Sequence, residues 1–156
     1  MQKITPFLWF NDQAEEAAKF YTSIFRNSGI LDVSHYGEAA EKAAHRPKGS
    51  VMTVSFQLDG QDFTALNGGP LFKFSEAVSL VVNCDSQQEV DHYWSKLSAG
   101  GAESQCGWLK DKYGFSWQIV PKAVIELLKK KDAKAERVMA AIMKMRKLDI
   151  ETLVNA

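Results

Sequence analysis

The 156-residue sequence predicts an α+β protein built from two tandem βαβββ modules and a C-terminal helical tail. Three observations support this fold class. The stretch "FLWFNDQAEEAAKFYTSIF" returns 73 positions later, in weaker form, as "LVVNCDSQQEVDHYWSKL". Each copy passes from an apolar strand through an Asp into an amphipathic helix that ends before glycine. Short strand-like runs follow each helix, whereas residues 122–156 match neither copy.

The first module begins with an apolar strand and a helix that Asp12 is expected to cap. Glu15, three residues beyond Asp12, completes the pattern of a capping box. Three strands are expected to follow at 30–36, 50–58 and 61–67, the last two joined by the turn "LDGQD". The segment "GEAAEKAAHRPKG" has no counterpart in the second copy and is expected to be a loop or a loose helix.

The second module repeats this order, with Asp85 as the expected cap and Gln88 at the capping-box position. Its strands are expected at 102–105, 106–110 and 115–120, with "DKYG" as the turn before the last strand. We therefore place the first module at 1–70, the second at 71–121 and the tail at 122–156, with both modules in one structural domain.

The tail is expected to hold two helices. Pro121 suits the first turn of a helix that runs through Leu128, and Asp132 can cap the next one. The second helix carries an apolar stripe of Val138, Ile142 and Met145. This stripe must be buried either on the rest of the chain or on a second chain.

Composition excludes several classes of function. Nineteen Lys and Arg balance nineteen Asp and Glu, and the pI is near 6.8, which argues against nucleic-acid binding and against a polybasic membrane contact. No apolar run is long enough for a membrane span, and the N-terminus lacks a signal-peptide pattern. Cys84 and Cys106 are too few and too far apart for a disulfide framework or a zinc site, so we expect reduced structural thiols in a cytoplasmic protein.

Four stretches carry a resemblance to a known family: "PFLWFNDQAEEAAKFYTSIF", "ALNGGP", "CGWLKDKYGFSWQIVP" and "ERVMAAIMKMRKLDI". Together they span nearly the whole chain and resemble the PhnB-like branch of the glyoxalase/vicinal-oxygen-chelate superfamily. Members of this branch often carry the label 3-demethylubiquinone-9 3-methyltransferase. The resemblance implies a glyoxalase/bleomycin-resistance/dioxygenase-like fold, in which the modules form a curved mixed sheet around a cleft. In metal-using members, the first and last strands of each module supply four ligands, typically His, Glu or Gln.

Carried over to this chain, those ligand positions fall at Pro6, Phe63, Ser79 and Gln118. Pro and Phe have no donor atom and Ser is a rare ligand, so only Gln118 fits. A transition-metal site needs about three or four well-placed donors. We therefore expect no metal and no other cofactor.

Alternation along the strands indicates a largely apolar cleft wall with a few polar points, which is typical of a small-molecule site. Gln118 could contact a ligand or bond to nearby backbone. Asn67 could contact a ligand or belong to the "NGGP" turn. Trp108 could stack on a planar ligand or fill the core. The expected cleft residues are Gln118, Asn67, Ser79, Leu8, Phe10, Phe63, Ala65 and Trp108. We expect His35, His45 and His92 to be solvated or satisfied elsewhere.

Three functions remain open. The first is metal-free binding of a small organic molecule, with or without turnover. The second is a metal-dependent lyase, isomerase or dioxygenase, and the third is an assembly protein whose cleft is filled by Phe10, Phe63 and Phe74. Methyl transfer is not expected, because it would require a doubly wound sheet with a glycine-rich nucleotide turn. The exposed apolar stripe of the tail also predicts a homodimer.

Overall fold

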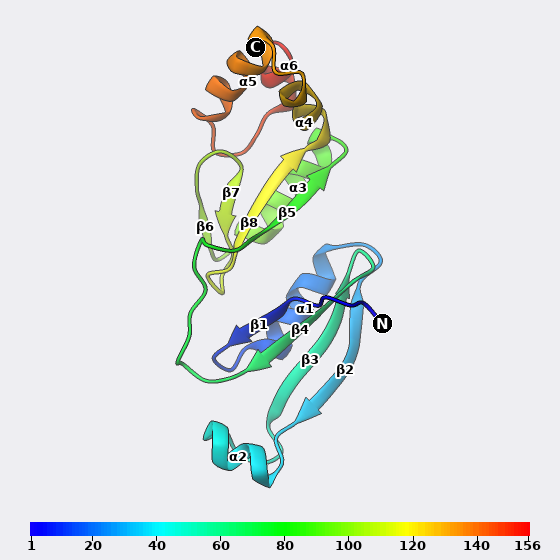
Figure 1. Cartoon of the computed structure of the whole chain (residues 1–156), viewed down its shortest axis with the longest axis vertical. Coiled ribbons are helices and arrows are strands. Elements are labelled where there is room, and N and C mark those ends of the chain that lie inside the picture. The colour runs from blue at the N-terminus through cyan, green and yellow to red at the C-terminus, as the bar shows by residue number, and fades with distance from the viewer. The chain divides into compact units, whose positions relative to one another are not determined.

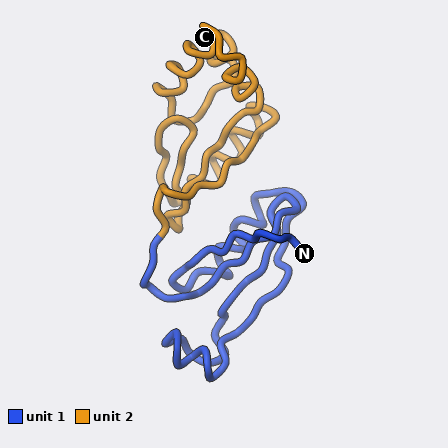
Figure 2. The backbone as a smooth tube through the Cα atoms, viewed as in Figure 1, with its two compact units in different colours: residues 1–73 blue, residues 74–156 orange.

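The computed structural model describes residues 1–156, and its chain runs through two four-stranded mixed sheets (Figure 1). The chain divides into two compact units, residues 1–73 and 74–156 (Figure 2). Each unit contains one sheet and a helix packed on it, so the prediction of two tandem βαβββ modules is confirmed. The C-terminal helices belong to the second unit.

The first unit has six elements: β1 (Phe7–Phe10), α1 (Ala14–Ile24), β2 (Gly29–His35), α2 (Glu38–Ala44), β3 (Val51–Leu58) and β4 (Gln61–Asn67). The strands are arranged β1-β4-β3-β2, with β1 parallel to β4 and the other pairs antiparallel. The segment without a counterpart in the second copy forms α2. The bounds of β4 are those predicted from the sequence. Where the bounds of β2 and β3 differ from their predicted ranges, they differ by one residue.

The core of the first unit lies between α1 and one face of its sheet. The alanines of α1 allow a close approach, and the Tyr21 ring stacks on Phe56, with centroids 6.3 Å apart. Phe56 in turn stacks on Phe63 at 5.5 Å. The buried helix residues are Ala14, Ala17, Ala18, Tyr21 and Ile24.

The second unit has eight elements: β5 (Ser79–Cys84), α3 (Gln87–Ser98), β6 (Ala102–Glu103), β7 (Trp108–Lys110), β8 (Ser116–Pro121), α4 (Lys122–Lys129), α5 (Ala133–Ile142) and α6 (Ile150–Val154). Its strand order, β5-β8-β7-β6, is that of the first sheet, and β5 is again parallel to β8. The shared topology agrees with the sequence repeat. The predicted strands at 102–105 and 106–110 are shorter in the structure.

The predicted helix caps of the two modules are wrong. The residue at the start of α1 is Gln13 and makes no capping hydrogen bond; instead Asn67, at the end of β4, accepts from the Ala14 backbone N–H at 2.8 Å. In the second module Ser86 caps α3, and its hydroxyl accepts from the Glu89 N–H at 3.2 Å. The Glu89 carboxylate accepts from the backbone N–H of Asp85, so the local pattern is a capping box displaced by one residue.

The C-terminal helices pack on their own second unit. The Asp132 cap is confirmed by a 2.8 Å bond from the Ala135 N–H, whereas α6 has no counterpart in the prediction. The backbone N–H groups of Cys106 and Gly107 donate to the carbonyls of Met145 and Arg146, both at 2.8 Å. Around these bonds lies one buried cluster, formed by Val124, Val138, Ile142, Leu148 and Leu153.

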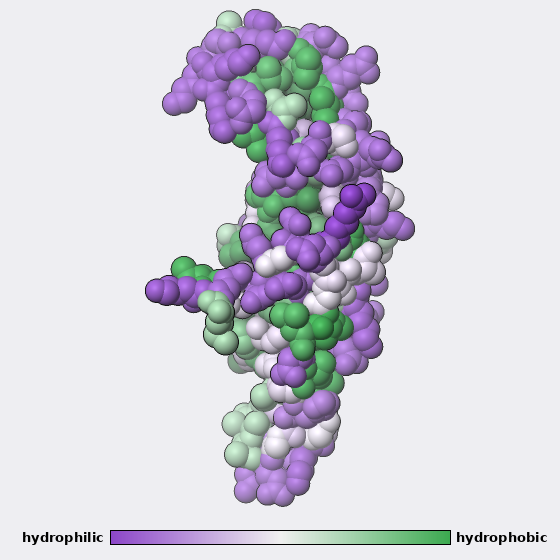
Figure 3. Space-filling view, turned by 90° about the vertical axis from the view of Figure 1, so that its right-hand side faces the viewer, coloured by the Kyte–Doolittle hydropathy of each residue, from purple (hydrophilic) through white to green (hydrophobic).

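The surface over the C-terminal helices is mainly hydrophilic, with an apolar area between the polar side chains (Figure 3). Met139 on α5 and Met143 at the end of this helix have exposed side chains. No helix combines the length and apolar character needed to cross a bilayer.

Candidate functional site

Each sheet has one face covered by its module's helix and one face that the helix leaves open. Burial alternates along the strands accordingly: in β4, Phe63, Ala65 and Asn67 are buried, whereas Thr64 and Leu66 are partly exposed. In β8, Trp117 and Ile119 are buried and Gln118 is partly exposed. The open faces are where a ligand can reach the strands.

Five residues expected on the cleft wall lie instead under α1. The Asn67 side chain accepts a hydrogen bond from the first residue of α1. Phe63 stacks on Phe56, which stacks on Tyr21 of α1. Leu8 pairs with Ala65 and Phe10 with Asn67, so these residues share the same face. The residues under the helix are Leu8, Phe10, Phe63, Ala65 and Asn67, all at most 8 % exposed. The prediction that these five residues line an open cleft wall is therefore wrong, because they are buried between the sheet and α1.

A one-residue difference between the modules explains this correction. The helices repeat at an offset of 73, because α1 begins at Ala14 and α3 at Gln87. The strands before them end at Phe10 and Cys84, which are 74 positions apart, since the first connector is one residue longer. A shift of one residue exchanges the two faces of a strand. The helix offset therefore gives the wrong face when it is extended into β1 and β4.

The strand pairing supplies the correct equivalences. Phe7 pairs with Thr64 in the first sheet, as Val81 pairs with Gln118 in the second. Thr64, not Phe63, is thus the counterpart of Gln118. By the same offset, the counterpart of Ser79 is Thr5, which lies just before β1.

In the second module the structure brings three of the predicted residues together. The Gln118 side-chain amide donates to the Ser79 hydroxyl at 2.9 Å. Trp108 is the cross-strand neighbour of Gln118 and lies on the same face. The Ser116 hydroxyl, on that face too, is buried without a hydrogen-bond partner. The amide of Gln118 is therefore satisfied by a side chain rather than by backbone.

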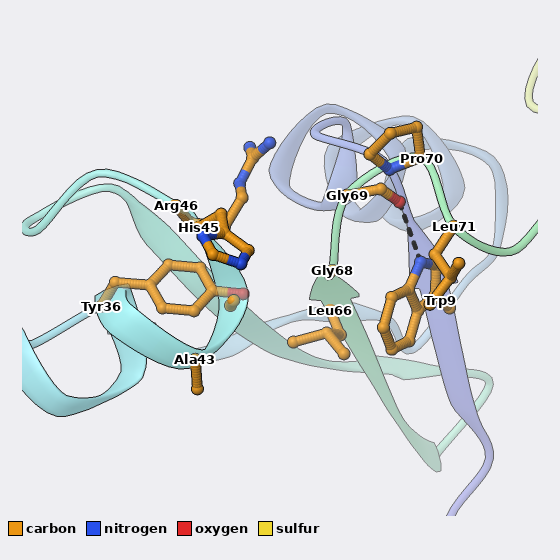
Figure 4. A pocket seen from close by; sticks show the side chains of 11 residues that line it. Trp9, Tyr36, Ala43, His45, Arg46, Leu66, Gly68, Gly69, Pro70 and Leu71 are labelled. Carbon is orange, nitrogen blue, oxygen red and sulfur yellow. Dashed lines mark hydrogen bonds between the residues drawn. The ribbon is translucent and has the colours of Figure 1, made fainter.

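The first module contains a pocket of about 860 Å³ that the sequence did not predict (Figure 4). We call it the Trp9 pocket. Trp9 and Leu66 contribute the open face of the sheet, and the end of α2 and the segment after β4 form its other sides. The lining residues are Trp9, Tyr36, Ala43, Ala44, His45, Arg46, Leu66, Gly68, Gly69, Pro70 and Leu71.

Trp9 is held in place by the chain that follows β4. Its indole N–H donates to the Gly69 carbonyl at 3.0 Å, and Phe72 packs edge-on against its ring. A Cβ atom at Gly68 would lie 2.3 Å from the ring, so only glycine permits this approach. The "NGGP" stretch therefore positions an aromatic wall as well as forming a turn.

The polar groups of the pocket come mainly from the α2 segment. The Tyr36 hydroxyl is buried and donates to the Asn67 carbonyl. His45 ends α2 in the left-handed region (φ 56°), where its N–H donates to the Glu41 carbonyl. Figure 4 shows His45 and Arg46 across the view from Trp9 and Leu71. The buried Arg46 Nε has no hydrogen-bond partner.

From the sequence, His45 was expected to lie in a loop or loose helix and to be solvated or satisfied elsewhere, and Trp9, Leu66 and Arg46 were not considered. The connector lengths were the available signal, because the longer first connector puts Trp9 rather than Phe10 on the open face. Nothing in the sequence pattern indicated that α2 would lie beside the strand ends.

The donor chemistry does not fit the transition-metal site that the fold family implies. With the corrected register, its four strand positions hold Thr5, Thr64, Ser79 and Gln118. These supply three hydroxyls and one amide, in place of the imidazole, thiolate or carboxylate donors that such metals prefer. The structure contains no group of three or more His, Cys, Asp or Glu side chains able to hold a metal.

Comparison with known proteins places this arrangement in a family. Residues 2–120 match the family model described as 3-demethylubiquinone-9 3-methyltransferase. A PhnB protein from Bacillus cereus, a candidate 3-demethylubiquinone-9 3-methyltransferase, is 39 % identical, with a TM-score of 0.68 over 77 % of this chain and 99 % of that one. None of the curated proteins matches the chain.

Two more distant structures share the fold. Protein PA1353 from Pseudomonas aeruginosa is 19 % identical, with a TM-score of 0.62 over 78 % of this chain and 98 % of its own. The fosfomycin resistance protein FosX from Listeria monocytogenes, in complex with Mn(II) and sulfate, is 17 % identical, with a TM-score of 0.56 over 85 % of this chain and 100 % of its own. The chain belongs to the PhnB-like 3-demethylubiquinone-9 3-methyltransferase family, within the glyoxalase-like fold.

Proposed function

We propose that this protein binds a small organic molecule in the Trp9 pocket. The observation that carries the proposal is the pocket itself, about 860 Å³ in volume, on the open face of the first sheet. Small-molecule sites are typically concave, about 300–1,000 Å³ in volume, and apolar with a few polar groups. Trp9, Leu66 and Leu71 supply the apolar surface, and Arg46 and His45 supply polar groups.

The wall of the pocket is preformed. The hydrogen bond to Gly69 and the contact with Phe72 fix the Trp9 ring, and the bond to Asn67 fixes Tyr36. Two aromatic side chains that are already ordered lose little conformational freedom when a ligand binds. This favours specific binding over a surface depression that fills only with water.

Binding is proposed without a transition metal and without methyl transfer. The donor set of the strand positions is unsuited to such a metal, and neither sheet is the doubly wound parallel sheet of a nucleotide-type methyl-donor site. Elemental analysis of the purified protein tests the first point. One transition metal per chain would revive the alternative of a metal-dependent lyase, isomerase or dioxygenase.

Gln118, Ser79 and Trp108 remain candidate ligand contacts of the second module. Because the Gln118 amide bonds to the side chain of Ser79 rather than to buried backbone, Gln118→Ala should leave the fold intact. A cleft enclosed by both modules also remains a prediction.

A fragment screen by two-dimensional ¹H–¹⁵N NMR tests the proposed site. The Trp9 indole N–H signal, assigned with Trp9→Phe, reports on the pocket wall. Leu66→Phe should narrow the pocket and weaken the binding of fragments that shift this signal, because Leu66 lines the pocket and pairs with Trp9 on the neighbouring strand. Leu31→Phe is the matched control, since Leu31 is exposed on β2 and does not line the pocket. Fragments that bind Leu66→Phe as well as the unchanged protein would contradict the proposal.

A further inference from the structure

The charge of the Trp9 pocket has one sign. None of its lining residues carries a carboxylate, and Arg46 is the one that carries a formal charge at neutral pH. A neighbouring depression of about 470 Å³ shares Arg46 and His45 and adds Lys42, Glu41 and Pro47. Glu41 is the one acidic residue that lines this second depression, and it forms no ion pair with Arg46.

Arg46 lacks the partners that a guanidinium normally has. Its Nε atom is buried without a hydrogen bond, and no carboxylate lies within ion-pair distance. A ligand cannot reach the buried Nε, but the two terminal nitrogens of the guanidinium are not buried and form no hydrogen bond or ion pair within the protein, so they are the donors open to a ligand. The guanidinium fork matches the geometry of two oxygens in a carboxylate or another oxyanion.

The rest of the pocket would hold an apolar body rather than a second charge. Trp9 and Leu66 lie next to each other on paired strands, and Leu71 lies on the same side of the view as Trp9 in Figure 4. The indole N–H is already used by Gly69, so the ring offers mainly its apolar surface. An ion that contacts Arg46 is thus flanked by apolar surface, which strengthens the electrostatic attraction relative to water.

From this arrangement, and resting on the proposed function, we infer that the ligand of the Trp9 pocket is a small organic anion. Its charged oxygens pair with the Arg46 guanidinium, and its apolar body lies against Trp9 and Leu66. The α2 segment, which only the first module contains, supplies the anion-binding part of the site.

The test compares naphthoate with its neutral counterpart naphthamide, using the Trp9 indole signal to measure both dissociation constants. Naphthoate should bind more tightly than naphthamide. Arg46→Gln should raise the dissociation constant of naphthoate about 10- to 100-fold, the range expected for a lost hydrogen bond to a charged group. The same substitution should leave the dissociation constant of naphthamide nearly unchanged. Arg46→Lys should give a smaller loss, because lysine keeps the charge but not the fork.

Arg26→Gln is the matched control, since it removes the same charge from an exposed residue outside the pocket. If naphthamide shifts the Trp9 signal at the same concentrations as naphthoate and Arg46→Gln changes neither, the pocket binds neutral molecules and the inference of an anion is wrong. If neither compound shifts the Trp9 signal at millimolar concentration, the proposed function fails together with the inference.

Discussion

At the scale of single residues, Asn67 links three parts of the first module. Its side-chain oxygen accepts from the Ala14 N–H at the start of α1, and its side-chain nitrogen donates to the Val51 carbonyl at 3.1 Å. Its backbone carbonyl accepts from the Tyr36 hydroxyl. Asn67 therefore stabilises the helix start and the pocket wall from beneath, whereas the sequence suggested a ligand contact or a turn.

Replacing Asn67 by alanine should lower the free energy of unfolding by about 1–3 kcal/mol, because the buried N–H of Ala14 and carbonyl of Val51 lose their partner. Asp12→Ala should change it by less than about 0.5 kcal/mol, since Asp12 is exposed and makes no capping bond. Urea denaturation measures both values. A larger loss in the Asp12 variant would restore the cap that the sequence predicted.

Asp111 has a comparable role in the second module. It is 2 % exposed; one carboxylate oxygen accepts from the backbone N–H groups of Tyr113 and Phe115, and the other accepts from the Trp117 indole at 2.9 Å. These bonds fix the "DKYG" turn and the start of β8. The predicted turn is thus present, and its first residue supports the strand that carries Gln118.

Burial makes the Cys84 thiol the less reactive of the two cysteines. Desolvation, together with the nearby Glu89 and Asp85 carboxylates, raises the pKa of Cys84 from 9.0 to about 12. At pH 8, iodoacetamide should therefore modify the partly exposed Cys106 and leave Cys84 unmodified until the protein unfolds. Peptide mass spectrometry measures both sites, and rapid modification of Cys84 in the folded protein would contradict the assignment.

The same shift has a consequence for stability. The folded state holds the thiol proton more tightly than the unfolded state, so its contribution is complete below about pH 9 and is lost as the pH rises towards about 12. Denaturation curves recorded across this interval should show a larger decline for the unchanged protein than for Cys84→Ala. Equal declines would show that other groups cause the alkaline loss.

At the scale of elements, the tail acts as part of the second module. Its helices enclose the Leu148 side chain, and its backbone extends the hydrogen bonding of the loop before β7. Gln87 at the start of α3 also bonds to the Leu148 carbonyl and to the Ile150 N–H. The sequence left open whether the tail packs on its own chain, and these contacts answer it.

Leu148→Ala should lower the free energy of unfolding by about 2–4 kcal/mol, because it leaves a cavity in the cluster that joins the tail to the module. Met139→Ala is the control on α5, where the side chain is 43 % exposed and little burial is lost. Chemical denaturation followed by Trp fluorescence measures the difference. Similar losses in both variants would mean that the tail is not packed on the module as described.

At the scale of the whole molecule, several large apolar side chains remain exposed on the single chain. Those that are more than half exposed include Phe7, Leu31, Leu71, Phe72 and Val78. The net charge is zero, so no long-range repulsion opposes self-association. The tail stripe on which the sequence-based prediction of a homodimer rested is buried within its own unit, so the homodimer remains a prediction that now rests on these exposed side chains.

Light scattering coupled to size-exclusion chromatography should therefore give about twice the 17.4 kDa mass of the chain. Burial of exposed apolar surface between two copies is the expected driving force, so added salt should not dissociate the dimer. A mass of one chain across the concentrations tested would contradict the prediction.

The sequence by itself determined the two modules, the order of their elements and the family. Those properties depend on local patterns, namely the alternation of strands, the spacing of helical faces and the repeat at 73 positions. Asp132 and Val138 were assigned correctly for the same reason, since a cap and a helical stripe involve neighbours along the chain.

Only the tertiary structure decided which strand face is open and where the pocket lies. A strand's face reverses with each residue, so one extra residue between Phe10 and α1 moved Phe63 and Asn67 under the helix and Trp9 and Thr64 to the open side. The Trp9 pocket also depends on residues distant in sequence, because Arg46 and Leu66 come to line the same pocket as Trp9 only after the sheet has formed. Contacts of this kind leave no periodic signal in a single sequence.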